Sequence, residues 1–468
     1  MHLRKLRKEN TPKMTGTVLT KPTPGICCGC PFPRGTGGSN SFRIPALVTL
    51  KDGTLVAAAD ARWNTTYDGG GLDTVTAVSR DGGRNWHYQF ANYLGDNGDV
   101  YNGSDSTCFI DPALAVTGEN AVYMLVDLYP YGVALNGSGN TVPVSARAFD
   151  ENGRLLLSKD EHKSYGYYLE NGKIYENSGC AVPGWEVDDH FFLTCPEGRK
   201  TNLFFKDSPF KVVRTGYLYL TVSRDGGASW SAPRLLDLKT DRELACLVAP
   251  GRGLVTGDGT IVFPVYSFGG NSGPGANSQR LGFLWSRDGE TWERSESFDH
   301  DWASESAAVE LASGKLRFFF RNGTKRLCYV DYCRESQSWG TAVVTDNPAN
   351  SNCQLSAIAH SRPVDGKQVI LVSCPTGPEE AGSNESRGEC RVNGKIYAGL
   401  VEEDGSMSWR EPTRVTRDEK QFLYSCLTEL PDGSVALLYE NLATAWGTGP
   451  DCYYTMEFQI FSARQLGL

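Results

Sequence analysis

A short segment with the pattern Ser-x-Asp-x-Gly-x-x-Trp recurs along this chain, and this repeat restricts the fold more than any other feature. SRDGGRNW occupies residues 79–86 and returns as SRDGGASW at 223–230. A shortened copy, SRDGETW, occupies 286–292, and EEDGSMSW at 402–409 keeps the spacing from Asp to Trp. Each copy follows a run of β-forming residues, so we interpret it as a β-turn capped by Asp, with Gly at a positive φ and Trp packed beneath. Such a repeat predicts an array of similar hairpins.

Strand-like runs separated by short turns make up most of the remaining sequence. Examples are ALVTL, AVYMLVDLY, GTIVFPVY and KQVILVSC, which turns such as DG, SG and PDG bound. No long segment shows a convincing helical period of 3.6 residues. The 52 glycines and the 11% of aromatic residues agree with many strands joined by tight turns. These observations predict an all-β fold, either a β-propeller or another array of short strands.

The repeat also divides the chain, because the first two copies lie much farther apart than the second and third. Residues 139–211 fill that interval with a polar, irregular sequence that contains its own aromatic residues, and we expect an inserted β-rich domain there. One ordered loop of that length would be unusual. We therefore expect an N-terminal arm at 1–35, a main domain formed by 36–138 and 212–468, and the insertion at 139–211.

Composition excludes some classes of function. Lysine and arginine number 46 against 55 aspartates and glutamates, a formal net charge of −9, which argues against a nucleic-acid-binding protein. Taken alone, the same net negative charge also disfavours an anionic substrate. The chain has only six histidines, with no HExxH motif and no pair at zinc-binding spacing. Acid–base chemistry is therefore expected from carboxylates and tyrosines.

Fourteen cysteines are too few for a disulfide scaffold, and we expect most of them to be buried free thiols. Cys27, Cys28 and Cys30 form the one cluster, but a metal site there lacks a second cluster and a histidine partner. The basic N-terminus is not followed by an apolar run, so this sequence shows no export signal, and its location stays open. No run approaches the ~18 apolar residues of a membrane span.

The segment SFRIP at Ser41–Pro45, followed by the Asp-box repeats, resembles the exo-α-sialidases (neuraminidases) of glycoside hydrolase family 33. The resemblance runs from about residue 40 to 465. It implies a six-bladed β-propeller. The insertion and the phrases FFKDSPF and YLYLTVSRDGG are most similar to a bacterial branch that includes the pneumococcal enzymes and the intramolecular trans-sialidases, which carry an extra β-domain at this place.

The resemblance implies a triad of arginines that binds the carboxylate of sialic acid. Arg43 of FRIP is its first member, Arg321 of FFFRNG its second and Arg391 of CRVNGKI its third, with Arg387 as the alternative for the third position. A guanidinium group matches a carboxylate with two parallel hydrogen bonds, so three of them form a strong local anion site. For a single arginine a surface ion pair would be the simpler interpretation.

The loop DARWNTTYDGGGLD is expected to carry the proton-transfer residue of the family, and Asp68 fits that position. Asp73 is the alternative, and either residue could instead cap a turn. Arg62 in the same loop matches an accessory arginine near the hydroxyl edge of the sugar. Asp111 in FIDPAL matches a further carboxylate of the site, although it could also be a simple turn aspartate.

The nucleophile pair implied by the resemblance is Tyr424 in QFLYSCL and Glu305 in ASESAAV. A neutral phenol approaches the carboxylate-bearing anomeric carbon of sialic acid without charge repulsion, and sialidases are known to use a tyrosine nucleophile. Because a phenol is a weak nucleophile, it needs an adjacent base such as Glu305. Glu440 in LLYEN matches the glutamate that orients the first arginine. Trp446 is a candidate for a wall that excludes water, or a packing residue.

Three functions follow from this pattern. The first is an exo-α-sialidase that cleaves sialylated glycans with retention, and the second is an intramolecular trans-sialidase, in which a hydroxyl of the sugar replaces water. The third, from a different class, is a non-catalytic glycan-binding propeller, because Asp boxes also occur in such proteins. Asp68, Glu305 and Tyr424 together favour an enzyme. None of these functions implies a metal or another cofactor, and the arginine triad shows that net charge does not exclude an anionic substrate.

Overall fold

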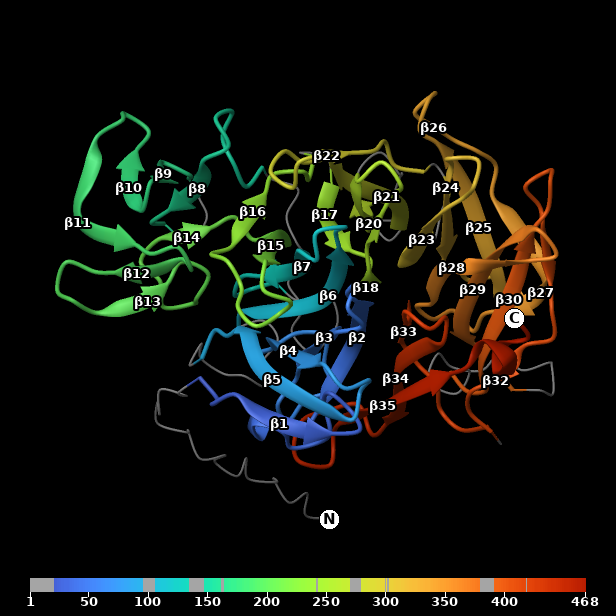
Figure 1. Ribbon diagram of the computed structural model, residues 1–468. Coiled ribbons are helices and arrows are strands. Elements are labelled where there is room, and N and C mark those ends of the chain that lie inside the picture. The colour runs from blue at the N-terminus through green and yellow to red at the C-terminus, as the bar shows by residue number, and fades with distance from the viewer. Residues whose placement is uncertain are drawn as a thin grey trace, which may run out of the picture.

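The computed structural model describes residues 21–95, 106–133, 147–160, 164–240, 243–269, 279–298, 300, 303–378, 391–417 and 419–468. Six sheets are arranged around a central axis as the blades of a β-propeller, and a seventh sheet lies beside them (Figure 1). Their strands pair antiparallel except for β18 (Gly251–Arg252), which pairs parallel with β6 (Cys108–Val116). The predicted all-β fold with six blades is confirmed. Two 3₁₀ turns, η1 (Thr36–Gly38) and η2 (Ala463–Leu466), complete the described elements.

The first three blades follow the chain from the N-terminus. Blade 1 contains β2 (Phe42–Thr49), β3 (Leu55–Ala61), β4 (Asp73–Ser79), β5 (Asn85–Asn92) and the outer strand β1 (Gly25–Cys28). Blade 2 contains β6 (Cys108–Val116), β7 (Val122–Tyr129), β15 (Tyr217–Ser223), β16 (Arg234–Leu236) and β18 (Gly251–Arg252). Blade 3 contains β17 (Glu243–Val248), β19 (Leu254–Val255), β20 (Ile261–Gly269), β21 (Gln279–Ser286) and β22 (Glu293–Arg294).

The last three blades complete the ring. Blade 4 contains β23 (Ser306–Glu310), β24 (Leu316–Phe320), β25 (Arg326–Cys333), β26 (Ser338–Trp339) and β27 (Val343–Ala349). Blade 5 contains β28 (Ser356–Val364), β29 (Lys367–Pro375), β30 (Gly394–Val401), β31 (Met407–Trp409) and β32 (Thr413–Arg414). Blade 6 contains β33 (Ser425–Glu429), β34 (Val435–Ala443) and β35 (Tyr454–Phe461). It packs on blade 1, where the hydroxyls of Thr49 and Thr428 are 2.9 Å apart.

The Asp boxes form the turns between the third and fourth strands of their blades. In the first copy the Ser79 hydroxyl donates to Asp81 and accepts the N–H of Gly83, and the indole of Trp86 donates to the Gly83 carbonyl. The third copy repeats these bonds around Asp288. The second copy keeps the bonds of Ser223 to Asp225 and Gly227. It lacks the indole bond, because Trp230 is half-buried and its Nε1 has no hydrogen-bond partner in the part of the chain that is described.

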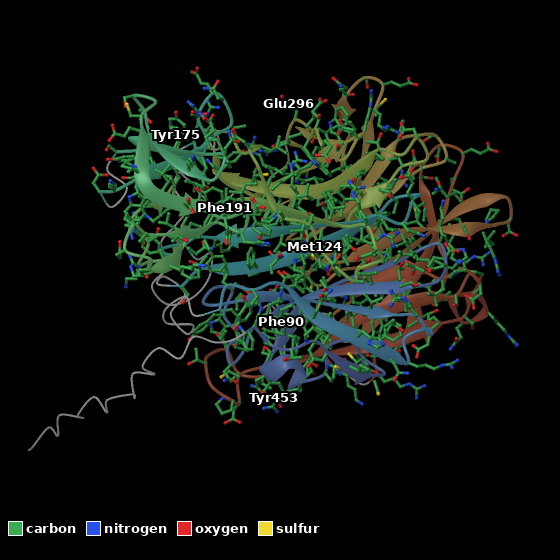
Figure 2. The ribbon with its side chains drawn as sticks, turned by 60° about the vertical axis from the view of Figure 1, so that its left-hand side comes forward. Phe90, Met124, Tyr175, Phe191, Glu296 and Tyr453 are labelled. Carbon is green, nitrogen blue, oxygen red and sulfur yellow. The ribbon has the colours of Figure 1, made fainter. Side chains whose placement is uncertain are left out.

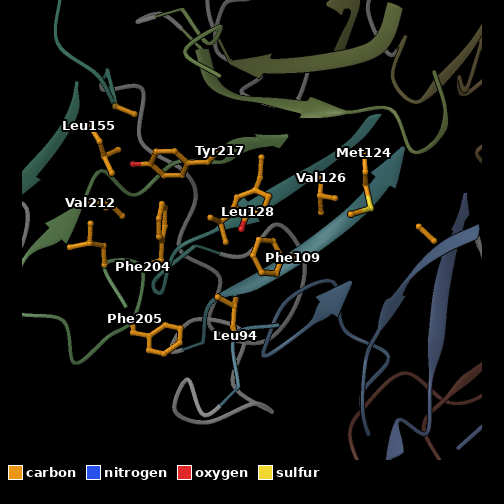
Figure 3. Packing of buried hydrophobic residues seen from close by; sticks show 14 of the residues in the cluster. Leu94, Phe109, Met124, Val126, Leu128, Leu155, Phe204, Phe205, Val212 and Tyr217 are labelled. Carbon is orange, nitrogen blue, oxygen red and sulfur yellow. The ribbon is translucent and has the colours of Figure 1, made fainter. Parts of the chain in front are cut away.

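The seventh sheet is the inserted segment. Its strands are β8 (Leu155–Ser158), β9 (Tyr167–Glu170), β10 (Lys173–Glu176), β11 (Ala181–Val187), β12 (Phe192–Thr194), β13 (Lys200–Asn202) and β14 (Lys211–Val212). Figure 2 shows this sheet at one side of the propeller, with Phe191 where the two meet. The ring of Phe191 lies 6.5 Å from that of Tyr219 on β15. Apolar side chains of the insertion, blade 2 and blade 1 form one continuous cluster, part of which Figure 3 shows.

The segment expected to be an N-terminal arm contributes β1, which pairs antiparallel with β5 from Gly25 to Cys28. Cys27 contacts the Thr36 hydroxyl, Cys28 the Asn85 side chain and Cys30 the Met456 carbonyl. All described cysteines are free thiols. No group of three or more His, Cys, Asp or Glu side chains in the described ranges is arranged to hold a metal ion. The described residues also contain no helix long and apolar enough to cross a membrane.

Candidate active site

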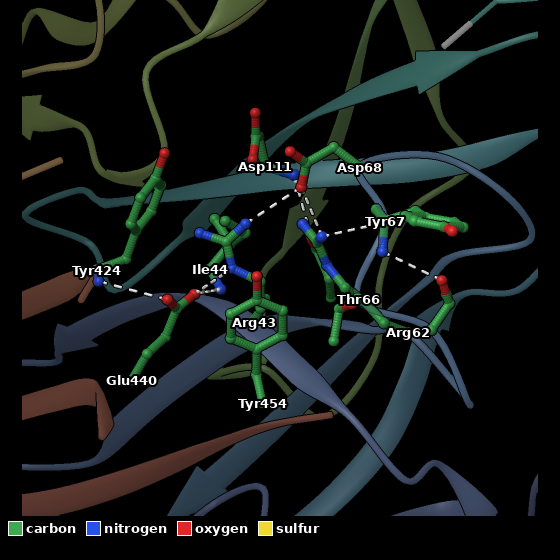
Figure 4. A network of polar contacts seen from close by, with 12 residues as sticks. Arg43, Ile44, Arg62, Thr66, Tyr67, Asp68, Asp111, Tyr424, Glu440 and Tyr454 are labelled. Carbon is green, nitrogen blue, oxygen red and sulfur yellow. Dashed lines mark hydrogen bonds and ion pairs between the residues drawn. The ribbon is translucent and has the colours of Figure 1, made fainter. Parts of the chain in front are cut away.

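The sequence-predicted site residues meet at one end of the propeller axis. Arg43 and Asp111 lie near the start of the innermost strands β2 and β6, and Glu305 and Tyr424 directly precede the innermost strands β23 and β33. Arg321 follows the second strand β24. In an antiparallel blade the start of the first strand and the end of the second lie at the same edge. Figure 4 shows part of the resulting cluster.

A similar β-bulge, in a segment with the pattern Phe-x-x-Pro, occurs at both Arg43 and Asp111. The register shifts between Arg43 and Ala46, and again between Ile110 and Ala113. Ile44 has φ 60° and Asp111 φ 63°, and each precedes a proline. A positive φ at a branched residue is strained, and bulges of this kind redirect side chains next to functional sites. The bulged N–H groups are satisfied by buried carboxylates, Ile44 by Glu440 at 2.8 Å and Asp111 by Asp60 at 3.1 Å.

Arg43 is buried at the centre of the cluster. Its Nε donates to Glu440 at 2.9 Å and its Nη1 to Asp68 at 3.1 Å. Its guanidinium lies 4.6 Å from the ring centres of both Tyr424 and Tyr454. Nη2 is buried without a hydrogen-bond partner among the described residues. Because a buried donor without an acceptor costs free energy, this nitrogen is suited to receive a ligand oxygen.

Asp68 lies on the loop between β3 and β4 and keeps 22% of its side chain exposed. Its Oδ1 accepts Nη1 of Arg43 and Nη1 of Arg62, the latter at 2.6 Å. Arg62 is fully buried and also contacts Asp60 at 2.8 Å through Nη2. Asp73, the alternative to Asp68, is buried and instead accepts the N–H of Leu94 and the indole N–H of Trp63.

Tyr424, Glu305 and Arg321 form a second linked group. The Tyr424 hydroxyl donates to Glu305, and Nη1 of Arg321 contacts Glu305 at 2.7 Å and the Tyr424 oxygen at 3.0 Å. Burial and the charge of Glu305 raise the pKa of Tyr424 well above its usual value, against the opposing effect of the arginines. Nε of Arg321 donates to the Asn352 side chain at 3.0 Å. The arrangement places a carboxylate base on a phenol that would otherwise stay protonated.

Arg391 completes the surroundings of Tyr424. Its guanidinium carbon lies 5.5 Å from the Tyr424 ring centre, and its Nε is buried without a partner in the described part of the chain. Arg43 and Arg321 approach the same tyrosine. Arg387, the alternative third arginine, lies outside the described residues. Three guanidinium groups therefore converge on one phenol, and two of them are also paired with the carboxyl groups of Glu440 and Glu305.

Trp446 lies on the loop after β34 and is 53% exposed. Its ring meets that of Tyr67 edge-on at 5.3 Å. The Thr66 hydroxyl accepts the N–H of Gly447 at 2.8 Å, and the Thr66 N–H donates to the Gly447 carbonyl at 3.0 Å. These bonds join the loop of Asp68 to the loop of Trp446, so the two residues are positioned together.

Several residues of the site were not predicted from the sequence. A turn that recurs before the second strand of each blade could have identified some of them. In each blade a turn residue with positive φ precedes the second strand, and the seventh residue after it is polar and lies near the axis. The turn residues are Gly53, Asn120, Gly259, Gly314, Gly366 and Gly433. The corresponding polar residues are Asp60, Asp127, Tyr266, Arg321, Ser373 and Glu440. Two of them were predicted, whereas Asp60 and Tyr266 were not. Tyr454, the second ring beside Arg43, carried no sequence signal.

The carboxyl groups near Asp68 affect one another. Burial raises the pKa of Asp111 well above its usual value, and the charges of Asp60, Glu305 and Asp68 raise it further. Burial raises the pKa of Asp60 to about 7, although Arg62 and Arg43 oppose this rise. Carboxyl groups whose pKa is raised in this way are typical of sites that move protons.

Comparison with known proteins agrees with this geometry. The family model described as a BNR repeat-like domain matches residues 44–396. An anhydrosialidase from Macrobdella decora is 31% identical over 464 residues, which cover 86% of this chain and 58% of the relative. The chain belongs to the BNR-repeat sialidase family.

Another sialidase is also similar to this chain over most of its length. Sialidase B from Streptococcus pneumoniae is 27% identical over 467 residues, covering 86% of this chain and 62% of the relative. The chain thus spans about three fifths of the length of these two relatives. The crystal structure of the intramolecular trans-sialidase from Ruminococcus gnavus, in complex with oseltamivir carboxylate, superposes with a TM-score of 0.79 and 28% identity. It covers 94% of this chain and 98% of that chain, so the likeness includes the inserted sheet.

Proposed function

We propose that this chain is an exo-α-sialidase, which cleaves terminal sialic acid from glycoproteins, oligosaccharides or glycolipids with retention of configuration. The observation that carries the proposal is the Tyr424–Glu305–Arg321 group, in which a buried phenol donates directly to a carboxylate. A tyrosine in this setting suits an anomeric carbon that bears a carboxylate, because a charged nucleophile would be repelled.

In the proposed reaction the substrate carboxylate binds to Arg43, Arg321 and Arg391. The free Nη2 of Arg43 and the free Nε of Arg391 supply donors that no described residue occupies. Glu305 takes the proton of Tyr424 as the phenol oxygen attacks the anomeric carbon, while Asp68 protonates the departing glycosidic oxygen. Asp68 then removes a proton from water as the water oxygen bonds to the anomeric carbon. The bond from that carbon to Tyr424 breaks, and Glu305 returns its proton to the phenolate oxygen. The arginines also stabilise the positively charged transition state by holding the adjacent carboxylate.

A second candidate is intramolecular trans-sialidase activity, in which a hydroxyl of the sugar attacks the tyrosine-bound intermediate and an anhydro-sugar is released. One structural observation favours it. The exposed Trp446 is packed on Tyr67 and joined through Gly447 to the loop of Asp68, so an apolar ring lies against the loop that carries the group that would activate water. The relatives named anhydrosialidase and intramolecular trans-sialidase support the same alternative.

Product analysis on a sialyllactose tests both functions in one experiment. Nuclear magnetic resonance of the reaction mixture distinguishes free sialic acid, released first as the α-anomer by a retaining hydrolase, from a 2,7-anhydro-sugar. Free α-sialic acid supports the hydrolase, and the anhydro-sugar supports the alternative. If the protein binds the sialoside without releasing lactose, it is a non-catalytic glycan-binding propeller and both proposals fail.

A further inference from the structure

Asp60 and Asp127 occupy equivalent positions in blades 1 and 2, each on the second strand and seven residues after a turn residue with positive φ. Both are almost completely buried. Both accept a backbone N–H from the innermost strand of the next blade. Asp60 accepts that of Asp111 at 3.1 Å, and Asp127 accepts that of Val248 at 3.1 Å. The two aspartates therefore share the task of joining consecutive blades near the axis.

Only Asp60 has an additional partner in the site. Nε and Nη2 of Arg62 both donate to its Oδ2, at 3.2 and 2.8 Å. The remaining nitrogen of the same guanidinium, Nη1, donates to Asp68 at 2.6 Å and to the Tyr67 carbonyl at 3.0 Å. No arginine contacts Asp127 within the described ranges. The guanidinium of Arg62 is planar, so two fixed nitrogens determine where the third one points.

We infer that Asp60 is a positioning residue for the proton-transfer aspartate, acting through Arg62. It fixes the plane of the guanidinium so that Nη1 meets Asp68, and its negative charge offsets part of the Arg62 charge. Without that charge, Arg62 would hold the ionised form of Asp68 more strongly, and Asp68 would be a poorer acid for the leaving oxygen. This inference rests on the proposed function, because it assigns Asp68 the proton transfer.

The charge of the Asp60 carboxyl group changes with pH around pH 7. Burial raises its pKa to about 7, while the facing groups Arg62, Arg43 and the N–H of Asp111 oppose the rise. The buried carboxyl of Asp111 and the thiol of Cys108 also face it, and the two carboxyl groups disfavour each other's ionised form. Asp60 therefore carries its full charge only above pH 7. Burial also raises the pKa of Asp127 well above its usual value.

The test compares kcat/KM on a fluorogenic sialoside for wild type, Asp60→Asn and Asp127→Asn between about pH 5.5 and 8.5. Asparagine keeps a carbonyl oxygen for the interblade N–H in both variants. We expect Asp60→Asn to be about tenfold slower than wild type above pH 7, which is the size of effect that loss of a charged hydrogen bond produces. The difference should shrink towards pH 5.5, where wild-type Asp60 is protonated. Asp127→Asn should keep a constant ratio to wild type.

A second variant keeps the test decisive if Asp60→Asn does not fold. Arg62→Lys removes the two-nitrogen contact from the other side and also the Nη1 bond to Asp68, so it should be slower at every pH, with its ratio to wild type falling further above pH 7. A ratio that does not change with pH in either variant, or an equal change in Asp127→Asn, would overturn the inference. If wild type itself releases no sialic acid in free or anhydro form, the proposed function fails instead, and the two failures are distinguished.

Discussion

At the scale of single residues, Tyr424 is a phenol whose pKa burial and Glu305 raise, so it needs that carboxylate to lose its proton. Tyr424→Phe removes the attacking oxygen and leaves the ring in place. We expect kcat on a sialoside to fall by about three orders of magnitude or more, with the thermal unfolding temperature close to that of wild type.

Tyr439→Phe is a matched control for this change. Tyr439 is as buried as Tyr424, and its hydroxyl donates to Glu457 at 2.8 Å, outside the site. This variant should lose some stability and keep its kcat. Near-normal turnover of Tyr424→Phe would contradict the assignment of the nucleophile, whatever the control shows.

Arg321 is predicted to recognise the substrate carboxylate through its flat guanidinium. Arg321→Lys keeps the positive charge but cannot present two parallel donors while also contacting Asn352. We expect KM for a sialoside to rise by about 10- to 100-fold. The preference for a sialoside over its methyl ester should fall with it, and inhibition by the two compounds measures that preference.

The control is Arg317→Lys, four residues earlier on β24. Arg317 is buried as well, but it pairs with Asp331 on β25 at 2.7 and 2.9 Å and donates to the Gly405 carbonyl of blade 5. This variant should unfold at a lower temperature with an unchanged preference between acid and ester. An Arg321→Lys protein that still discriminates as wild type does would show that the triad has been misassigned.

At the scale of elements, one glycine in each of the first three Asp boxes lies against the preceding blade. A side chain on Gly83 would meet Phe458 of blade 6 at 2.2 Å, one on Gly227 would meet Val78 of blade 1 at 2.9 Å, and one on Gly289 would meet Tyr123 of blade 2 at 2.1 Å. The repeat therefore forms a turn and also allows adjacent blades to approach closely. This explains why the tryptophan and the glycine recur together while the intervening residues vary.

Substitutions at Gly82 and Gly83 can separate the cost of backbone strain from the cost of overpacking between blades. Both have positive φ, at 73° and 84°, but an added Cβ on Gly82 would meet nothing within 4 Å. Gly82→Ala should therefore show only the backbone strain of about 1 kcal/mol, whereas Gly83→Ala should lose about 2 kcal/mol more through overpacking against Phe458. Urea unfolding of the two variants measures this difference. Equal losses would mean that the glycine is required only for the turn.

Local chemistry made the hairpins predictable, since each Asp box satisfies its own backbone groups and each strand shows its own pattern. Features that depend on distant partners were not predictable. The pairing of β1 with β5 joins residues that no periodic pattern connects, and the positive φ of Ile44 is stabilised by Glu440 from the other end of the chain. The free Nε1 of Trp230 is a similar case, because the box sequence there is intact.

The same distinction applies to the site. Arg43, Arg321 and Tyr424 could be proposed because their flanking residues resemble a known family, and the structure brings them together around one phenol. The polar residues at the seventh position after the turn were not predicted as a set, because their residue type differs from blade to blade. Blade 1 has Asp60 at this position and blade 3 has Tyr266. The position is repeated, but the residue type is not.

At the scale of the whole molecule, the net charge of −9 does not exclude a site for an anion, because the guanidinium groups of Arg43, Arg321 and Arg391 gather around one residue. The turns of the Asp boxes lie at the opposite end of the blades from the site, since they join the third strand to the fourth. The arginines converge at the axis, where low local dielectric strengthens their field. The burial of carboxyl groups in and near the site also makes the stability of the folded protein depend on pH.

Burial raises the pKa of both Asp60 and Asp73 to about 7. A carboxyl group with a raised pKa binds more protons in the folded chain than in the unfolded one, so its contribution to stability is present at low pH and is lost as the pH rises towards 7. Asp81 and Asp288 act in the opposite direction, because turn N–H groups lower their pKa to about 2, but their contribution is lost only as the pH falls below about 4. The folded protein should therefore be most stable in mildly acidic solution.

We expect the free energy of unfolding to be higher at about pH 5.5 than at pH 8.5, with Asp60 and Asp73 each contributing about 2 kcal/mol to the difference. Thermal unfolding followed by circular dichroism across this range measures it. Asp73→Asn cannot titrate, so its unfolding temperature should depend less on pH than that of wild type, although loss of an acceptor for Leu94 or Trp63 lowers it overall. An unfolding temperature that rises from pH 5.5 to 8.5 would show that these buried carboxyl groups are ionised throughout, held by their donors against the effect of burial.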